Sequence, residues 1–385
     1  MALLPPCRRR SWLVFHASAA VAGASLAMPA RAQPGGAARP LGIVQIADTS
    51  PAQQDVSRDF LIGSRAAWQD LNARGGLRGR PVLHRVVETD GSAAATRDAL
   101  AAAAADPACI ALSGCVGDPV AAALPPLLLR GPAAGLANVA PWLQRSGVDI
   151  GTNTFLIFAG HEAQIAHAVR NLAVMGVAEL GVIYADAAAR RQAQAAVARS
   201  ATALGLRVRD WQPDAAGLLP LGQRLGPQTP AILLFVGGAP ELQQFVQGLG
   251  RQKRQRYVVA LADVSLQVLA PLGLAARSSA SVIAAQAVPL VTAGVPVVRA
   301  YRDVLARLFD EAPSPLGLAG FVAARYTAEV IAAIDGTPTR AAVLAAFQKR
   351  TPVDLGGFRI DYDAGGRSAG PVTQSMLAPD GRIVG

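Results

Sequence analysis

The chain has 385 residues, more than one compact hydrophobic core usually holds, and this length predicts two domains. Hydrophobic residues make up 52% of the composition and charged residues 16%, values that exclude an intrinsically disordered chain. The formal net charge is +10, and beyond residue 32 the basic residues are scattered apart from one run at 251–256. Because this run has no interleaved aromatic residues, we interpret it as a solvated loop and expect no nucleic-acid partner.

Residues 1–32 have the pattern of a secretory signal peptide. A basic segment is followed by an apolar run and by Ala30-Arg31-Ala32, a small-residue cleavage site before Gln33. A membrane anchor is the alternative, but the run falls short of about 20 firmly apolar residues. The pair Arg9-Arg10 leaves twin-arginine and Sec export both open. We therefore expect a periplasmic protein cleaved after Ala32, with residues 33–39 as a flexible leader.

Residues 40–90 predict a strand, a helix and a second strand. The first strand is the apolar run 41–47, which turn residues follow. From Asp59, apolar residues recur every three or four positions, and Gly75-Gly76 end this helix because a left-handed cap favours glycine. The loop after the first strand of such a unit lies at the carboxyl edge of the sheet, where open α/β sheets bind ligands.

The same alternation continues along the chain and restarts near residue 162. Two successive blocks of strands and helices predict an α/β fold with two Rossmann-like lobes. We interpret the last segment, 358–385, as a β-meander because turn residues divide it into short runs. The predicted helices include 93–105, 162–174, 190–204, 240–249, 297–308, 318–334 and 340–348, and the predicted strands include 109–114, 155–158, 180–186, 231–238, 257–263 and 280–291.

Two cysteines, Cys109 and Cys115, remain after the predicted signal peptide. An oxidising compartment favours a disulfide between such a pair. The residues between them are predicted to form a strand, which would separate the two by about 20 Å. A disulfide needs Cα atoms within about 7 Å of each other. We therefore predict that these two cysteines are not bonded to each other.

The block NARGGLRGRP at 72–81, the Ser50-Pro51 loop and the helix that contains Gly63 resemble the opening of type 1 periplasmic binding proteins, in the branched-chain amino-acid binding group. Two segments near the end, DLGGFRIDYDAGGRS and APDGRI, are also similar to that family. The resemblance implies two lobes, a ligand cleft between them and a hinge that the chain crosses near Ile157, 287–289 and Pro352. The implied division is residues 40–157 plus 288–351 for the N-terminal lobe, and 158–287 plus 352–385 for the C-terminal lobe.

The resemblance also implies where ligand contacts would lie. The family's ligand-binding serine falls at Asp118, beside Gly117, while its tyrosines and most of its other contacts for an amino-acid zwitterion are replaced here. Its acidic contact falls near Asp263. The candidate ligand-binding residues are Ser50, Gly117, Asp118, Asn138, Ala140, Tyr184, Asp186, Gly238 and Asp263.

Two of these candidates bear on the ligand's charge. A carboxylate ligand would be repelled by Asp118 unless an arginine or a helix N-terminus offset it. Asp118 and Asp263 therefore favour a neutral, cationic or hydroxylated polar ligand. The alternatives are structural: Asp118 caps the helix that follows, Asn138 holds a turn, and Asp263 caps a helix that starts at Ser265. Tyr184 and Asp186 are also consistent with a solvated surface.

Enzyme motifs are missing from the sequence. We find no GxSxG, HExxH or phosphate-binding loop, and His161 and His167, six residues apart, do not share a helix face. We therefore expect no catalytic residue, no metal site and no cofactor. The hypothesis is a monomeric periplasmic component of an ABC importer that captures a small polar solute and delivers it to an inner-membrane permease. The rivals are a ligand-sensing subunit of a signalling receptor on the same fold and an enzyme without a recognisable motif.

Overall fold

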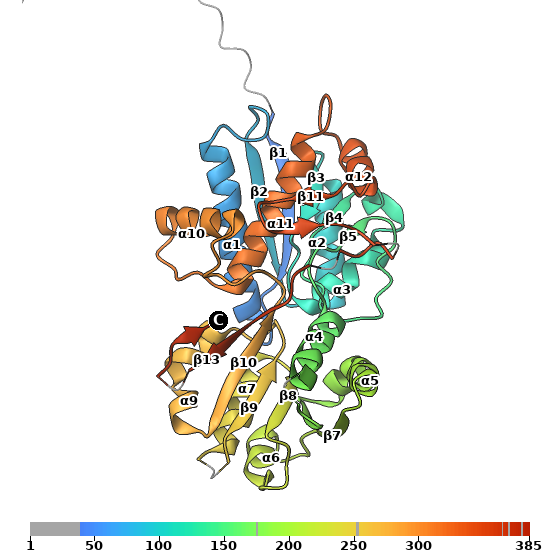
Figure 1. Ribbon diagram of the computed structural model, residues 1–385. Coiled ribbons are helices and arrows are strands. Elements are labelled where there is room, and N and C mark those ends of the chain that lie inside the picture. Colours follow the sequence, from blue (N-terminus) through green and yellow to red (C-terminus); the bar gives the residue numbers. More distant parts are fainter. Residues whose placement is uncertain (1–38, 175, 252–253, 364, 369, 379) are drawn as a thin grey trace, which may run out of the picture. The chain divides into compact units, whose positions relative to one another are not determined.

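The computed structural model describes residues 39–385 except 175, 252–253, 364, 369 and 379 (Figure 1). The predicted signal peptide and most of the predicted leader lie outside these residues. Among the described helices, none combines the length and the apolar character that crossing a bilayer requires.

The first lobe is built on a sheet of five parallel strands, in the order β2-β1-β3-β4-β5. Every residue of β1 is buried, as the apolar run predicts, and its side chains alternate between two cores. Ile43 packs with α1, α10 and α11 on one face, and Val44 packs with α2 and α3 on the other. The strands are β1 (Leu41–Asp48), β2 (Val82–Thr89), β3 (Cys109–Ser113), β4 (Ala137–Val139) and β5 (Thr154–Phe155).

Two helices of this lobe meet at glycines. A Cβ atom on Gly63 of α1 would overlap the carbonyl oxygen of Gly317 in α11, and one on Gly320 would overlap the carbonyl oxygen of Phe60. The helix backbones are therefore in direct contact, which side chains at these positions would prevent. The helices of this lobe are α1 (Gln54–Ala73), α2 (Ala93–Ala105), α3 (Asp118–Leu127), α10 (Pro296–Leu308), α11 (Pro315–Ala332) and α12 (Arg340–Gln348), with a 3-10 turn, η1 (Gly131–Ala133).

The second lobe is built on a sheet of seven strands, in the order β14-β13-β10-β9-β8-β6-β7. The strands β6 to β10 run parallel, and β13 and β14 add antiparallel strands at one edge. Helices α4 and α5 contribute to the core on one face, and α6, α7, α8 and α9 to the core on the other. The predicted two-lobe α/β fold is confirmed.

The bounds of the second-lobe elements follow the predicted alternation closely. The strands are β6 (Glu179–Tyr184), β7 (Arg207–Trp211), β8 (Ile232–Val236), β9 (Arg256–Ala260), β10 (Ala280–Gln286), β13 (Thr373–Leu377) and β14 (Ile383–Val384). The helices are α4 (His161–Val174), α5 (Ala187–Ala203), α6 (Leu218–Arg224), α7 (Ala239–Leu249), α8 (Leu266–Leu269) and α9 (Leu274–Arg277), with a 3-10 turn, η2 (Ala270–Leu272).

The C-terminal segment does not form the predicted single meander. Strand β12 (Arg359–Ile360) pairs with β11 (Val353–Asp354), whereas β13 pairs with β10 and β14. The segment divides because Phe358 and Ile360 are buried in the first-lobe core, while β13 completes the other sheet. Tyr362 and Val372, which follow β12, also pack against the first-lobe core. The exact lobe boundaries stay a prediction.

Candidate functional site

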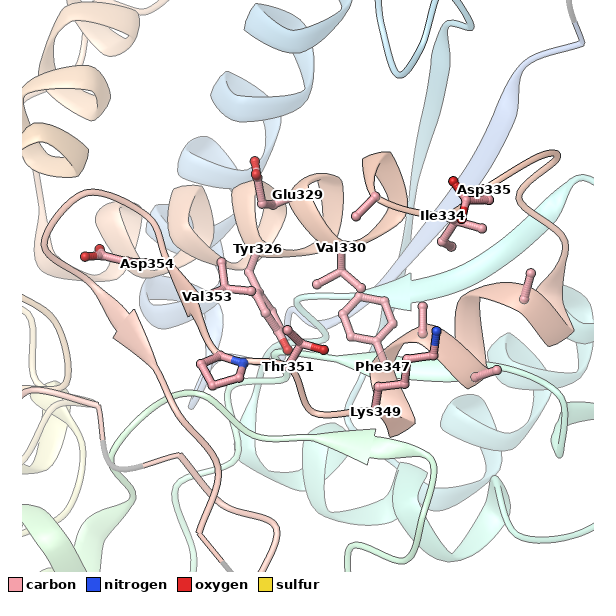
Figure 2. Close-up of a pocket in the computed structure, with 15 residues that line it drawn as sticks. Tyr326, Glu329, Val330, Ile334, Asp335, Phe347, Lys349, Thr351, Val353 and Asp354 are labelled. Atoms are coloured by element: carbon pink, nitrogen blue, oxygen red, sulfur yellow. The ribbon is translucent and has the colours of Figure 1, made fainter.

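A cavity of about 680 Å³ lies between α11, α12 and the residues around β11. Figure 2 shows Val330 of α11 and Phe347 of α12 facing one another across it. None of the nine predicted site residues lines this cavity. We therefore build the candidate site from the residues at the carboxyl ends of the strands, where the predicted residues gather.

Asp118 is the first residue of α3, and its carboxylate is already occupied. Oδ1 accepts the backbone N–H groups of Gln144 (3.1 Å) and Arg145 (3.2 Å), and Oδ2 accepts Nε–H of Arg145 at 2.5 Å. The N-cap position belongs to Gly117, so the capping interpretation of Asp118 is wrong. The carboxylate instead holds the loop after β4, and Arg145 offsets its charge.

Asp263 lies in the loop after β9 and bonds to two side chains from other segments. Oδ1 accepts the indole N–H of Trp142 at 3.0 Å, and Oδ2 lies 2.7 Å from Nε2 of His161. The N-cap position of α8 belongs to Ser265, and no side chain makes a capping bond there, so the capping interpretation of Asp263 is also wrong. Asp263 thereby joins a first-lobe loop to the start of α4.

The two members of this ion pair change each other's pKa. Burial disfavours the charged imidazolium of His161, but the charge and hydrogen bond of Asp263 outweigh it and raise the pKa of His161. Burial also disfavours the Asp263 carboxylate, yet the charge and hydrogen bond of His161, with the bond from Trp142, lower the pKa of Asp263. The pair is therefore most strongly bonded in its charged form.

Two buried glutamines extend this cluster. The carbonyl oxygen Oε1 of Gln164 accepts the backbone N–H of Ala262 at 2.9 Å, and its Nε2 donates to Oε1 of Gln144 (2.6 Å) and to the carbonyl of Ala159 (2.7 Å). The Nε2 atom of Gln144 is buried and has no hydrogen-bond partner among the described residues. Trp142, Gln144, Arg145, Gln164 and His161 were not among the predicted site residues.

Ser50 and Gly117 meet at Asp48, the last residue of β1. The backbone N–H of Ser50 donates to Oδ1 of Asp48 at 2.9 Å. Gly117 has φ of 94°, and a Cβ atom there would overlap the Asp48 side chain. The other carboxylate oxygen of Asp48, Oδ2, is buried without a hydrogen-bond partner in the described part of the chain. Glycine at 117 is thus required for this loop to approach β1.

A family model described as periplasmic binding protein matches residues 41–378. The chain belongs to this family. The resemblance predicted from the opening of the sequence is therefore confirmed, and the family is one of periplasmic solute-binding proteins. The comparison with curated proteins returns no match.

Solved structures share the fold of this periplasmic binding protein at low sequence identity. An extracellular ligand-binding receptor from Verminephrobacter eiseniae has a TM-score of 0.78 at 19% identity, with 90% of this chain and 100% of that chain covered. A substrate-binding periplasmic protein from Ralstonia solanacearum has a TM-score of 0.77 at 22% identity, with coverage of 89% and 99%. A branched-chain amino acid transporter substrate-binding protein from Streptococcus pneumoniae, solved with isoleucine, has a TM-score of 0.74 at 14% identity, with coverage of 89% and 97%.

Asn138 and Ala140 of this periplasmic binding protein are fully buried at the end of β4. Asn138 lies within the strand rather than in a turn, and its Nδ2 is 3.5 Å from Oγ1 of Thr154. Ala140 has φ of 51°, an uncommon conformation for a residue with a side chain, and donates its N–H to Phe155. Ala140 thus shapes the turn that carries Trp142, whereas Asn138 belongs to β4 itself.

The three remaining second-lobe candidates do not bond to this cluster. Tyr184 is buried between α4 and α5, where burial and the nearby Asp210 raise its pKa to about 12, so the solvated interpretation of Tyr184 is wrong. Asp186 is exposed and caps α5 by accepting the N–H of Ala189 at 2.7 Å. Gly238 occupies the N-cap position of α7.

Metal-ligating side chains do not gather in the described residues. No group of three or more His, Cys, Asp or Glu residues that could hold a metal ion occurs there. His161 pairs with Asp263, whereas Nε2 of His167 lies 3.0 Å from Nδ2 of Asn171 on the same helix. Cys109 and Cys115 are free thiols in the buried core.

Proposed function

We propose that this chain is the solute-binding component of an ABC importer, which captures a small polar solute and delivers it to an inner-membrane permease. The observation that carries the proposal is the pair of hydrogen bonds that the Asp263 carboxylate accepts from Trp142 and His161. The bond from Trp142 connects the carboxyl end of the first sheet to that of the second. A solute that entered between these ends would meet polar groups from both lobes, as hinge closure requires.

The ligand class must be inferred from the side chains of this protein, because solved structures with the same fold are described with different ligands. One solved relative is a branched-chain amino acid transporter protein in complex with isoleucine, and another is described as a fatty acid ABC transporter substrate-binding protein. We assign the candidate ligand contacts to the loops after β1, β3, β4 and β9, which bring together Ser50, Gly117, Asp118 and Asp263. Asn138 and Ala140 at the end of β4, Gly238 at the N-cap of α7, and Tyr184 and Asp186 at the end of β6 are secondary candidates, because none of them bonds to the Asp263 cluster.

A thermal-shift screen of the chain from Gln33 tests solute binding. The panel contains amino acids, amides, polyamines and small carboxylates. A ligand at 100 times its dissociation constant that binds only the folded state adds about 2.7 kcal/mol to the free energy of unfolding. We expect at least one class to raise the melting temperature, and Asp263→Asn to weaken that effect. If no compound of the panel raised the melting temperature, the result would contradict solute binding.

Cross-linking of the liganded protein to inner membranes tests the transport role. We expect capture of an ABC permease, and less capture when ligand is absent. Capture of a sensor kinase instead would show a receptor subunit. Size-exclusion chromatography of the same sample checks the expected monomer. The full chain has a mass of 39.5 kDa, and the sample is lighter by residues 1–32. A dimer would elute at twice the mass of this shortened chain.

A further inference from the structure

The cavity of about 680 Å³ in the first lobe is formed by a single stretch of the chain. Its lining residues all fall between Tyr326 and Asp354, from the C-terminal part of α11 through α12 to β11, and we call it the α11–α12 cavity. The volume is in the range of about 300–1,000 Å³ that is usual for small-molecule pockets. Because no described residue of the loops after β1, β3, β4 and β9 lines it, a ligand bound there would need neither the second lobe nor hinge closure.

Two aromatic rings line the interior of the α11–α12 cavity. Tyr326 and Phe347 are each 1% exposed, and their ring centroids lie 5.5 Å apart with the planes at 71°. The hydroxyl of Tyr326 is 3.1 Å from that of Tyr362, and burial raises the pKa of Tyr326 to about 12, so the phenol is uncharged at neutral pH. Figure 2 shows both rings together with Val330 of α11. The interior is therefore apolar and aromatic, and aromatic faces attract cations.

Charged side chains lie at the edge of the α11–α12 cavity. Figure 2 shows the carboxylates of Glu329, Asp335 and Asp354 spread around this edge, to which Lys349 also contributes. All four residues are exposed, and none of them forms an ion pair with another described residue. Oδ1 of Asp354 accepts two backbone N–H groups at 2.8 Å, which hold this carboxylate in place. The edge thus carries more negative than positive charge, although the formal charge of the chain is +10, and it attracts cations.

We propose that the α11–α12 cavity is a second binding site, which takes an organic cation with an apolar body, such as an alkylamine or an arylalkylamine. The apolar body packs against Val330 and the two rings, while the ammonium group lies near the aromatic faces and the edge carboxylates. An anion of the same shape would be attracted by Lys349 alone and repelled by three carboxylates. This site goes beyond the proposed function, since it uses none of the candidate ligand contacts of that function.

Matched ligand sets test the preference for a cation. Isothermal titration calorimetry of the chain from Gln33, at pH 7 and low salt, compares 3-phenylpropylamine, 3-phenylpropan-1-ol and 3-phenylpropanoate, and then octylamine, octan-1-ol and octanoate. We expect each amine to bind about 10-fold more tightly than its alcohol, and each carboxylate to bind most weakly. The advantage of the amines should shrink in about 0.5 M salt, because exposed charges are screened there.

Substitutions at the edge test the source of this preference. Glu329→Gln and Asp335→Asn should each weaken amine binding about 2- to 5-fold, whereas Lys349→Gln should strengthen it by a similar factor. The control is Asp303→Asn, because Asp303 is an exposed acid of α10 that does not line the cavity. Tighter binding of the carboxylates, with a loss in Lys349→Gln, would overturn the assignment of a cationic ligand.

A larger side chain at Val330 tests the location. Val330→Trp fills the space between α11 and α12, and we expect it to abolish amine binding. Ala332→Trp is the matched control, because Ala332 is exposed on the same helix and lies outside the lining. Circular dichroism and the melting temperature check that both variants fold. If Val330→Trp is destabilised, Ala346→Phe fills the cavity from α12 instead.

The outcomes keep the second site distinct from the proposed function. Amine binding that is unchanged in Asp263→Asn and lost in Val330→Trp supports the second site. Binding that is lost in Asp263→Asn and unchanged in Val330→Trp would overturn it and would place the amine in the candidate functional site. If neither amine bound, the second site would be refuted, while the solute screen described under the proposed function would stand on its own result.

Discussion

The indole N–H of Trp142, in the loop after β4, donates to the carboxylate of Asp263, in the loop after β9, over 3.0 Å. The two residues are far apart in sequence and belong to loops that leave different sheets. Their bond joins polar side chains of the two lobes, and His161, also of the second lobe, forms an ion pair with the same carboxylate. Changes at this contact should alter both stability and its dependence on pH.

The pair His161–Asp263 should stabilise the protein most between about pH 4 and pH 6.5. The pKa of His161 is raised above 6.5, so its contribution is complete below that pH and is lost as pH rises through the raised pKa. The pKa of Asp263 is lowered below 3.8, so its contribution is complete above 3.8 and is lost as pH falls through the lowered pKa. Urea unfolding at intervals from pH 4 to pH 9 should show His161→Gln most destabilised near pH 5.5.

The comparison must be between His161→Gln and the parent chain, because another histidine acts in the opposite direction. Burial lowers the pKa of His84 to about 4, so His84 destabilises the folded chain progressively as pH falls below 6.5. This effect is common to both proteins and cancels in the difference. A difference that grows toward pH 9 would contradict the assigned ion pair.

The contact between Asp118 and Arg145 should appear as coupling in a double-mutant cycle. The side chains are 12% and 30% exposed, and the carboxylate also accepts two backbone N–H groups. We expect Asp118→Asn and Arg145→Gln to show a coupling free energy of about 1–2 kcal/mol in urea unfolding. The exposed pair Arg359–Asp361 provides the control and should couple more weakly. Equal coupling free energies in the two cycles would show that the Asp118–Arg145 pair is no stronger than an exposed ion pair.

The crossing of α1 and α11 should tolerate no side chain at Gly63. Alanine there would overlap the Gly317 carbonyl, so the helices must separate, at a cost of about 1–3 kcal/mol or more in the free energy of unfolding. Gly226→Ala is the matched control, because no described atom lies within 4 Å of a Cβ atom at that position. Calorimetry should show a clear fall in melting temperature for the first variant only; similar values for the two would argue against backbone contact.

The thiols of Cys109 and Cys115 should be inert in the folded protein. Burial raises the pKa of Cys115 to about 12 and also raises that of Cys109, and alkylation requires the thiolate. We expect iodoacetamide at pH 8 to modify neither thiol in native buffer and both in 6 M guanidinium, as mass spectrometry of the intact chain would show. Rapid modification in native buffer would place a thiol at the surface.

Regular elements could be predicted from the sequence because their evidence is local. The helix at 340–348 was predicted with the bounds that α12 has, since its apolar residues and its flanking residues lie within one short stretch. The final strands were harder. The partner of β13 is β10, far upstream, and nothing in the short run 373–377 indicates which sheet it joins.

The candidate site depended on contacts that no local pattern reveals. An arginine that offsets Asp118 was left open, but Arg145 could not be named from the sequence because it lies in an irregular loop. His161 was set aside because only its spacing from His167 was considered, whereas its partner Asp263 is 102 residues away. The carboxyl ends of parallel strands lie at one edge of a sheet, where ligands bind. A search for residues of opposite charge in the loops that follow these strands would have suggested that Asp118 lies near Arg145.

The order of elements along the chain has a consequence for biosynthesis. The first sheet is complete by residue 155, yet it is covered on one face by α10, α11 and α12, and the second sheet ends with β13 and β14. The core that Ile43 shares with α10 and α11, and the core that contains Leu377 of β13, cannot close before the ribosome has made nearly the whole chain. These two cores therefore stay incomplete until synthesis is almost finished, and the emerging polypeptide remains accessible to chaperones over that time.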